Sequence, residues 1–167
     1  MRKIITSLGL LMVVLTATVV GTTAAVAADD KPVVRVGTEG TYPPFSYRDA
    51  DNKLTGYDVD VIRAVAKKAG WKLEFVESAW ESLFPALQAD RIDLIANQVT
   101  INEERLGKYE MSIPYTFSRG VIVTRKDDTS VKTLADIKGK TAAQSPTSNW
   151  SEVATEAGAK IESVDEL

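Results

Sequence analysis

An arginine in the segment from Ile95 to Ser112, IANQVTINEERLGKYEMS, lies where helix electrostatics disfavour a cation. Asn102 is predicted to cap a short helix, and Glu103 and Glu104 in its first turn suit the positive end of the helix dipole. Arg105 follows in the same turn, where an arginine is favourable only if an anion faces it. A guanidinium can bind a carboxylate through two parallel hydrogen bonds. Two alternatives stay open for Arg105: a carboxylate-binding site, or a solvated arginine bonded to a neighbouring acidic residue.

A second possible anion site is the segment SPTSN, in which Thr147 and Ser148 stand at the start of a predicted helix. The free amide groups of a helix N-terminus can bind an anion, and the two hydroxyl groups can add donors. The commoner role of serine and threonine at this position is simple capping of the helix.

Three aromatic residues, Tyr42, Phe45 and Trp80, lie next to predicted strand ends. Aromatic rings at such places can hold an aliphatic or cationic group of a ligand. Core packing is the commoner role for any one of them.

The amino-acid composition excludes several classes of function. The chain has no cysteine and no histidine, which excludes a thiol nucleophile, a disulfide framework, a histidine-based catalytic triad and ordinary zinc sites. Its formal net charge is −3 and its basic residues form no cluster, so nucleic acid is not expected as a partner. We expect no metal ion and no cofactor.

The N-terminal residues are typical of a secretory signal peptide. Arg2 and Lys3 precede a mostly apolar run over residues 4–21, and Ala25-Val26-Ala27 provides the small residues that signal peptidase requires. We expect cleavage after Ala27, which would leave a chain of formal charge −5. A retained membrane anchor is the alternative, because the apolar run is almost long enough to span a bilayer. Without a cysteine for lipid attachment, the mature protein is expected to be soluble in the periplasm.

The first part of the chain alternates between strand and helix patterns. Its predicted elements, strand first and then in alternation, are 33–37, 58–69, 71–77, 80–90 and 91–96. Asp58 is expected to cap the first helix and Gly70 to end it. This order predicts a parallel sheet with crossover helices, in which ligands gather at the carboxyl ends of the strands.

A second unit of strands and helices follows a polar connection. A short helix is expected from Glu103, and the sequence GVIVT predicts a strand over 120–124. Thr133 is then expected to cap a helix, and a strand, a helix ending at Gly158 and a further strand follow. The chain is therefore predicted to form two α/β lobes.

Three segments together resemble the extracytoplasmic solute-binding proteins of polar amino-acid ABC importers. They are VRVGTEGTYPPFSYRDADNKLTGYDVDVIRAVAKKAG, WESLFPALQADRIDLIANQVTINEER and KTLADIKGK, and they occur in the family's order and spacing. The resemblance extends from Val33 to the end of the chain. The segment AAQSPTSNW is similar to cystine-binding members in particular.

The resemblance implies a two-lobed fold of the type II periplasmic-binding-protein kind, which closes on one ligand. Lobe 1 would span 28–120, and 121–167 would be the start of lobe 2. The rest of lobe 2 and the segment that returns to lobe 1 are expected to be incomplete, because the chain stops at Leu167. The implied function is binding of a free amino acid and its delivery to an ABC permease, by a protein that is monomeric when complete.

The resemblance also assigns roles to individual residues. Arg105 would grip the α-carboxylate of the ligand, in a pocket lined by Thr100 and by the backbone of Asn97 and Gln98. Thr147 and Ser148 would meet the same carboxylate from the other lobe. The acidic residue that usually holds the α-ammonium group is expected in the missing part.

At the side-chain end of the ligand, Tyr42 and Trp80 would sandwich the aliphatic part, and Glu39 would face the far end. Ile113 stands where the family often has an acidic residue, so that turn is given no ligand role. One alternative function stays open: a periplasmic enzyme on the same scaffold, such as a dehydratase of cyclic acids. Such an enzyme needs a buried acid or base, and Glu39 is the acidic residue of the pocket that could serve.

Overall fold

The computed structural model describes residues 31–164, and the chain from Lys31 onward forms one compact unit. The expected signal peptide, residues 1–27, and its cleavage site after Ala27 lie outside the described residues.

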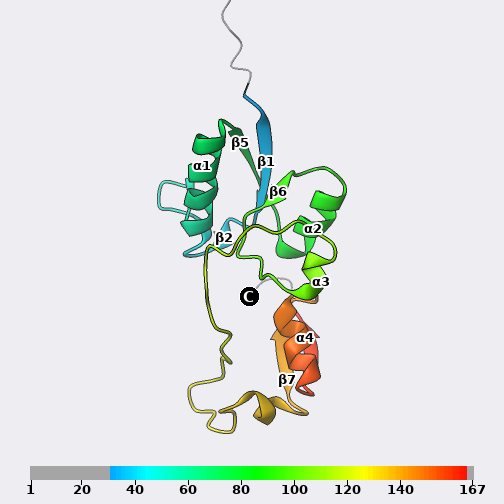
Figure 1. Cartoon of the computed structure of the whole chain (residues 1–167). Coiled ribbons are helices and arrows are strands. Elements are labelled where there is room, and N and C mark those ends of the chain that lie inside the picture. Colours follow the sequence, from blue (N-terminus) through cyan, green and yellow to red (C-terminus); the bar gives the residue numbers. More distant parts are fainter. Residues whose placement is uncertain (1–30, 165–167) are drawn as a thin grey trace, which may run out of the picture. The chain divides into compact units, whose positions relative to one another are not determined.

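Three parallel strands form the main sheet, with β1 (Val33–Thr38) between β5 (Lys72–Glu77) and β6 (Leu94–Ile95) (Figure 1). β1 pairs with β5 along its whole length. The predicted parallel sheet with crossover helices is confirmed, although the third strand is shorter than the expected 91–96. The carboxyl ends of β1 and β6 lie side by side, so the residues that follow them are brought together.

The two crossover helices pack on opposite faces of this sheet, because successive residues of β1 point to opposite sides. Val36 forms a core cluster with Ile62 of α1 (Tyr57–Ala69). The next residue, Gly37, faces Leu83 of α2 (Trp80–Gln88), and a Cβ atom added to Gly37 would come within 3.1 Å of the Leu83 side chain. Glycine at this position allows α2 to approach the sheet closely.

The boundaries of α1 correct one detail of the sequence prediction. Gly70 ends the helix in the left-handed conformation, as expected. Asp58 does not cap the helix, which begins one residue earlier, after Gly56. Asp58 lies in the first turn instead, and its buried carboxylate accepts hydrogen bonds from Gln98 rather than from the helix.

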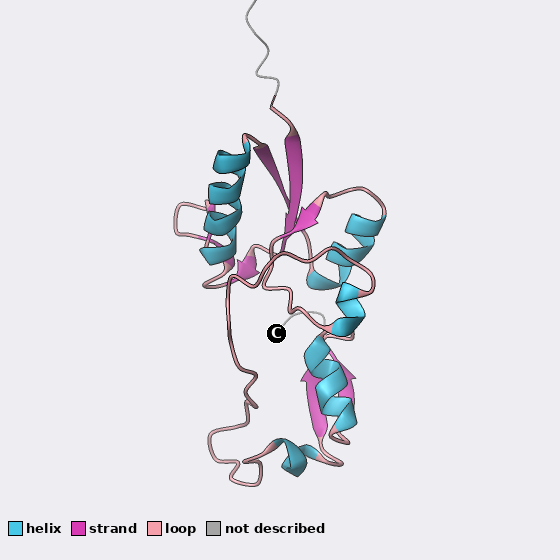
Figure 2. Cartoon of the chain, in the orientation of Figure 1, coloured by secondary structure: helices cyan, strands magenta, loops and turns pink. Residues whose placement is uncertain are grey.

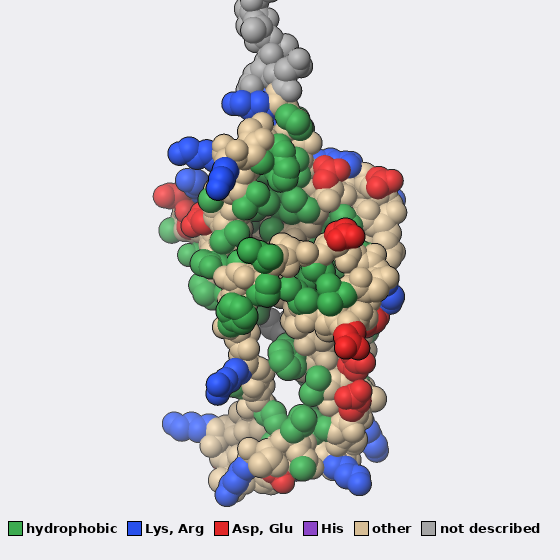
Figure 3. Space-filling view, viewed as in Figure 1, with side chains coloured by type: hydrophobic (Ala, Val, Ile, Leu, Met, Phe, Trp, Pro, Cys, Tyr) green, Lys and Arg blue, Asp and Glu red, His purple; other side chains and the backbone are tan. Residues whose placement is uncertain are grey.

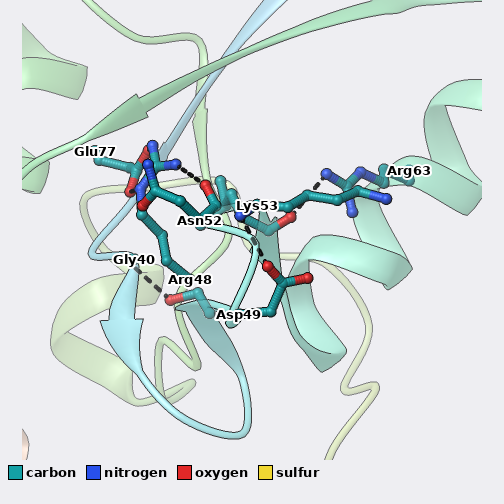
Figure 4. A network of polar contacts seen from close by, with 9 residues as sticks. Gly40, Arg48, Asp49, Asn52, Lys53, Arg63 and Glu77 are labelled. Atoms are coloured by element: carbon teal, nitrogen blue, oxygen red, sulfur yellow. Dashed lines mark hydrogen bonds and ion pairs between the residues drawn. The ribbon is translucent and has the colours of Figure 1, made fainter.

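A small antiparallel sheet, which the sequence analysis did not predict, lies in the loop after β1. It consists of β2 (Thr41–Tyr42), β3 (Ser46–Arg48) and β4 (Leu54–Thr55). Figure 4 shows the polar contacts around it: Arg48 bonds to Glu77 of β5, and Arg63 of α1 donates to the carbonyl oxygen of Leu54 at 3.0 Å. These contacts fix the loop that carries Tyr42 against the main sheet.

The remaining elements are shown in Figure 2. A short helix α3 (Glu103–Leu106) follows β6, with Asn102 as its cap, as predicted. Farther along, Thr133 begins a short 3-10 helix, η1 (Leu134–Ile137), in a capping box with Asp136. β7 (Thr141–Gln144) and β8 (Lys160–Ser163) are parallel and joined by α4 (Asn149–Glu156), which ends two residues before the expected Gly158.

The predicted strand over 120–124 is wrong, since residues 107–133 contain no helix and no strand. A β-branched run becomes a strand only when a neighbouring strand accepts its hydrogen bonds, and no described strand pairs with this segment. Its apolar side chains are left at the surface, with Phe117 88% and Val123 87% exposed. Figure 3 shows hydrophobic side chains at the surface of one face of the molecule.

An ion pair joins the start of β1 to the residue that precedes β6. Both guanidinium edge nitrogens of Arg35 bond to the Asp93 carboxylate, Nε at 3.0 Å and Nη2 at 2.6 Å, and the Arg35 amide adds a bond of 2.7 Å. The amide of Asp93 donates in return to the carbonyl oxygen of Arg35 at 2.8 Å. These bonds hold the pKa of Asp93 at about 2, below its ordinary value of 3.8.

We expect the replacement Asp93→Asn to lower the free energy of unfolding at pH 7, and the loss to shrink as the pH falls. A depressed carboxyl pKa contributes stability that is complete above 3.8 and disappears as the pH falls through about 2. Urea unfolding of both proteins at several pH values between 2 and 7 measures the difference. Asp127→Asn, an exposed turn position, is the control and should show no such trend. A gap between Asp93→Asn and the wild type that is constant over this pH range would contradict the prediction.

Candidate functional site

The carboxyl ends of β1 and β6 open into a pocket with a cavity volume of about 200 Å³. This is smaller than the pockets that hold drug-sized molecules, so it suits a small ligand. Eight of the nine predicted site residues line it: Glu39, Tyr42, Trp80, Asn97, Gln98, Thr100, Arg105 and Ser148. The ninth, Thr147, lines a neighbouring pocket instead.

Arg105 lies in the wall of this pocket and is only 6% exposed. The alternative of a solvated arginine is therefore wrong. Its guanidinium donates to the carbonyl oxygen of Thr100 at 3.0 Å and to that of Thr147 at 3.3 Å. It lies over the rings of Trp80 and Phe84, 5.5 and 5.4 Å from the ring centroids, where the negative faces attract a cation.

The environment of Arg105 leaves its charge incompletely balanced. Burial lowers the pKa of the guanidinium, and the Glu104 carboxylate acts in the opposite direction. The guanidinium remains a cation, since an arginine pKa lies far above neutral pH. Its hydrogen bonds within residues 31–164 go to carbonyl oxygens, which carry only partial charges. An anion entering the pocket would find a buried, preoriented cation.

Asn97 holds Glu39 in place on the other side of the pocket. The Asn97 Oδ1 atom accepts from the Glu39 amide at 2.9 Å, from the Thr38 hydroxyl at 3.1 Å and from the Ser46 hydroxyl at 3.2 Å. Its Nδ2 atom donates to the Glu39 carboxylate at 2.5 Å. Asn97, Thr38 and Ser46 are buried. The side chain of Asn97 is thus occupied within the protein, and it orients the Glu39 carboxylate.

Gln98 is held in a similar way by Asp58. The Gln98 amide and its side-chain Nε2 atom both donate to the Asp58 carboxylate, at 2.8 and 2.5 Å. The Tyr115 hydroxyl also donates to Asp58, at 3.1 Å. Burial raises the pKa of Asp58, whereas these hydrogen bonds lower it, and burial together with Asp58 raises the pKa of Tyr115. The sequence analysis gave Asp58 the role of a helix cap and no role in the site, because an aspartate at the start of a helix most often serves as its cap.

Tyr42 and Trp80 each pack against a neighbouring phenylalanine. The ring centroids of Tyr42 and Phe45 are 5.2 Å apart, and those of Trp80 and Phe84 are 5.3 Å apart in an edge-to-face arrangement. Tyr42 is 44% exposed, so much of its ring is open to solvent. Both rings line the pocket and can contact a ligand there.

Thr147 and Ser148 differ in how their hydroxyl groups are used. The Thr147 hydroxyl donates to the Glu81 carboxylate at 2.7 Å. The Ser148 hydroxyl accepts from the Trp150 amide at 3.2 Å and caps α4, which is the commoner role considered for it. Four pocket residues were not predicted: Gln144, Ser145, Asn149 and Trp150. Gln144 and Ser145 lie at the carboxyl end of β7, and Asn149 and Trp150 begin α4, so all four flank the predicted pair.

Residues 31–164 contain no group of acidic side chains arranged to hold a metal ion. None of the helices between residues 31 and 164 has the length and apolar character needed to cross a membrane.

Comparison with known proteins relates the chain to binding proteins for amino acids. The sequence profile of "Bacterial extracellular solute-binding proteins, family 3" matches residues 34–165. The L-cystine-binding protein TcyA of Bacillus subtilis is 54% identical over 136 residues, which are 81% of this chain and 50% of TcyA. The chain spans about half the length of the curated relatives it matches.

Solved structures agree with this relation. An ancestral arginine-binding protein bound to glutamine has a TM-score of 0.75 and 38% identity, covering 81% of this chain and 61% of that one. The L-cystine solute receptor of Neisseria gonorrhoeae, in its unliganded open conformation, has a TM-score of 0.52 and 52% identity, covering 83% and 59% of the two chains. The fold is thus that of the two-lobed amino-acid-binding proteins. The chain belongs to the bacterial extracellular solute-binding proteins of family 3.

Proposed function

We propose that this protein binds a free amino acid, cystine or another polar amino acid, outside the cytoplasmic membrane and delivers it to an ABC importer. One observation carries the proposal. Arg105 is a buried cation in the wall of a small pocket, and its hydrogen-bond partners there are carbonyl oxygens. A ligand carboxylate supplies the full negative charge that this environment lacks.

The pocket carries charges of both signs, as an amino acid does. Arg105 would bind the α-carboxylate, with Thr100 and Ser148 beside it. Glu39, held by Asn97, would accept a donor at the far end of the ligand, such as the second ammonium group of cystine. The rings of Tyr42 and Trp80 would cover the aliphatic part between the two ends.

Binding without catalysis is the function that the pocket favours. The alternative of a dehydratase needs a buried acid or base, whereas Glu39 is only half-buried and its carboxylate is oriented by one hydrogen bond from Asn97. The relatives described above are named as binding proteins. Isothermal titration with L-cystine, together with a product assay on a prephenate-like cyclic acid, separates the two functions. Release of product from the cyclic acid would overturn this part of the proposal.

We propose a location and an assembly for the protein that are consistent with its family. We place it in the periplasm after cleavage following Ala27, and the ABC permease is its partner at the membrane. Residues 28–120 would belong to lobe 1 and residues 121–167 to lobe 2, with a monomer as the complete form. The described fold fits this division, since β1, β5 and β6 belong to one sheet and β7 and β8 to another.

Replacing Arg105 with alanine should weaken amino-acid binding strongly. Removing one member of a buried charge pair costs about 2–5 kcal/mol, which is roughly 30-fold to several-thousand-fold in affinity. Arg105→Lys should restore binding only in part, because an ammonium group lacks the two-pronged geometry of the guanidinium. Isothermal titration of the purified variants with L-cystine gives the affinities.

A matched control is Lys108→Ala, which removes an exposed cation two residues after α3 and should leave the affinity within about twofold of wild type. Wild type should also bind an amino acid much better than its carboxamide, and Arg105→Ala should lose most of that preference. Affinity of Arg105→Ala within about twofold of wild type, which is under about 0.5 kcal/mol, would refute the assignment of Arg105.

Trp80→Ala should weaken ligands with large side chains more than it weakens glycine. The indole ring lines the pocket, and glycine has no side chain for it to cover. The measurement is the ratio of affinities for L-cystine and glycine in the wild type and in the variant. An equal loss for both ligands would mean that Trp80 acts only in packing, through its contact with Phe84.

A further inference from the structure

We propose that Asp58 is a positioning residue of the ligand pocket: it holds Gln98, and with it the pocket wall from Asn97 to Thr100, in the binding conformation. The proposal rests on the function proposed above. Asp58 lies on α1 and is not among the residues that line the pocket. Its effect on the ligand must therefore pass through Gln98.

The first observation is how completely the Asp58 carboxylate is used. The side chain is 1% exposed. Oδ2 accepts from the backbone amide of Gln98, and Oδ1 accepts from the Gln98 side chain and from the Tyr115 hydroxyl. An ionised carboxylate has acceptor sites on both oxygens and no donor, so it can satisfy all three donors at once.

The second observation is the backbone conformation of Gln98. Its φ angle is +50°, in the left-handed region that residues with a Cβ atom disfavour. Such a conformation persists only when the surrounding contacts determine it. Gln98 is tied to Asp58 at both its backbone and its side chain, and these bonds bridge 40 residues of sequence. The two bonds supply the constraint that the conformation needs.

The third observation is the position of Gln98 between the two charged ends of the pocket. The residue before it, Asn97, orients the Glu39 carboxylate. Two residues after it, the carbonyl oxygen of Thr100 accepts a hydrogen bond from Arg105. Rotation of the backbone at Gln98 would displace both neighbours, so Asp58 fixes both ends of the pocket through one residue.

Helix α1 gives Asp58 a rigid base. Val59 and Ile62, on the same helix, are buried, and Ile62 belongs to the core cluster with Val36 of β1. The first turn of a helix also favours a negative charge. The pocket wall is thereby tied to the core of the sheet and not only to the loop in which it lies.

The experiment compares Asp58→Ala with Asp60→Ala, a control in the same helical turn whose side chain is exposed and paired with Arg63. Hydrogen exchange of the Gln98 amide, measured by NMR in the absence of ligand, should become faster in Asp58→Ala and stay unchanged in Asp60→Ala. The affinity for L-cystine should fall by about tenfold or more in Asp58→Ala, within the range of couplings between contacting residues. The control should remain within about twofold of wild type.

A double-mutant cycle with Gln98→Gly distinguishes positioning from a general loss of stability. Glycine adopts positive φ angles without a tether, so Asp58→Ala should weaken L-cystine binding much less in the Gln98→Gly background. Purely structural destabilisation would instead reduce the affinity equally in both backgrounds, and that additivity would overturn the proposal. Unchanged exchange of the Gln98 amide in Asp58→Ala would also overturn it.

The proposal can still be tested if a variant does not fold or if the wild type binds no amino acid. If Asp58→Ala does not fold, Asp58→Asn keeps the size of the side chain but replaces one acceptor with a donor. It should accelerate Gln98 exchange and weaken L-cystine binding to a smaller extent, and wild-type values for both would reject the proposal. If the wild type binds no amino acid, the proposed function fails, while the exchange measurement still decides whether Asp58 holds Gln98.

Discussion

The buried charge of Arg105 is the constraint on which the rest of the site depends. A guanidinium removed from water needs hydrogen-bond acceptors or aromatic ring faces on several sides. The fold provides the carbonyl oxygens of Thr100 and Thr147 and the ring faces of Trp80 and Phe84. Asn102 must cap α3 for Arg105 to reach these groups, and α2 must place Trp80 over the guanidinium. Gly37 leaves room on this face of β1 for the side chains of Ile92 and of Leu83 in α2, since an added Cβ atom would overlap the Ile92 side chain and lie 3.1 Å from that of Leu83.

Sequence patterns predicted those helices and strands that are determined by their own residues and not by a partner elsewhere in the chain. α1 and β5 have apolar residues at regular intervals, and Gly70 marks a helix end through its backbone conformation. The strand expected over 120–124 failed because a strand depends on a partner as well as on its residues. β2, β3 and β4 are two or three residues long, too short to show any alternation, so the small sheet could not be found.

For the candidate site, the sequence predicted which residues come together but not how their side chains are oriented. A family resemblance supplied the residue types at strand ends, and strand ends are where an α/β fold brings them together. Side-chain orientation was not predictable in this way. The Thr147 hydroxyl bonds to Glu81, which is 66 residues away in sequence, and Asp58 bonds to Gln98 across 40 residues. Long-range hydrogen bonds of this kind leave no local pattern, and they decide which groups remain free for a ligand.

The hydrogen bonds within the site have a consequence for binding energy. Glu39 and Gln98 are already fixed by Asn97 and Asp58 before any ligand arrives, and Arg105 is held by carbonyl oxygens. The entropy of ordering these side chains is therefore lost during folding and not during binding. A ligand then exchanges its own hydration for groups that do not need to reorganise. The polar contacts that satisfy buried groups in the free protein are thus the same contacts that would prepare the pocket for the proposed amino-acid ligand.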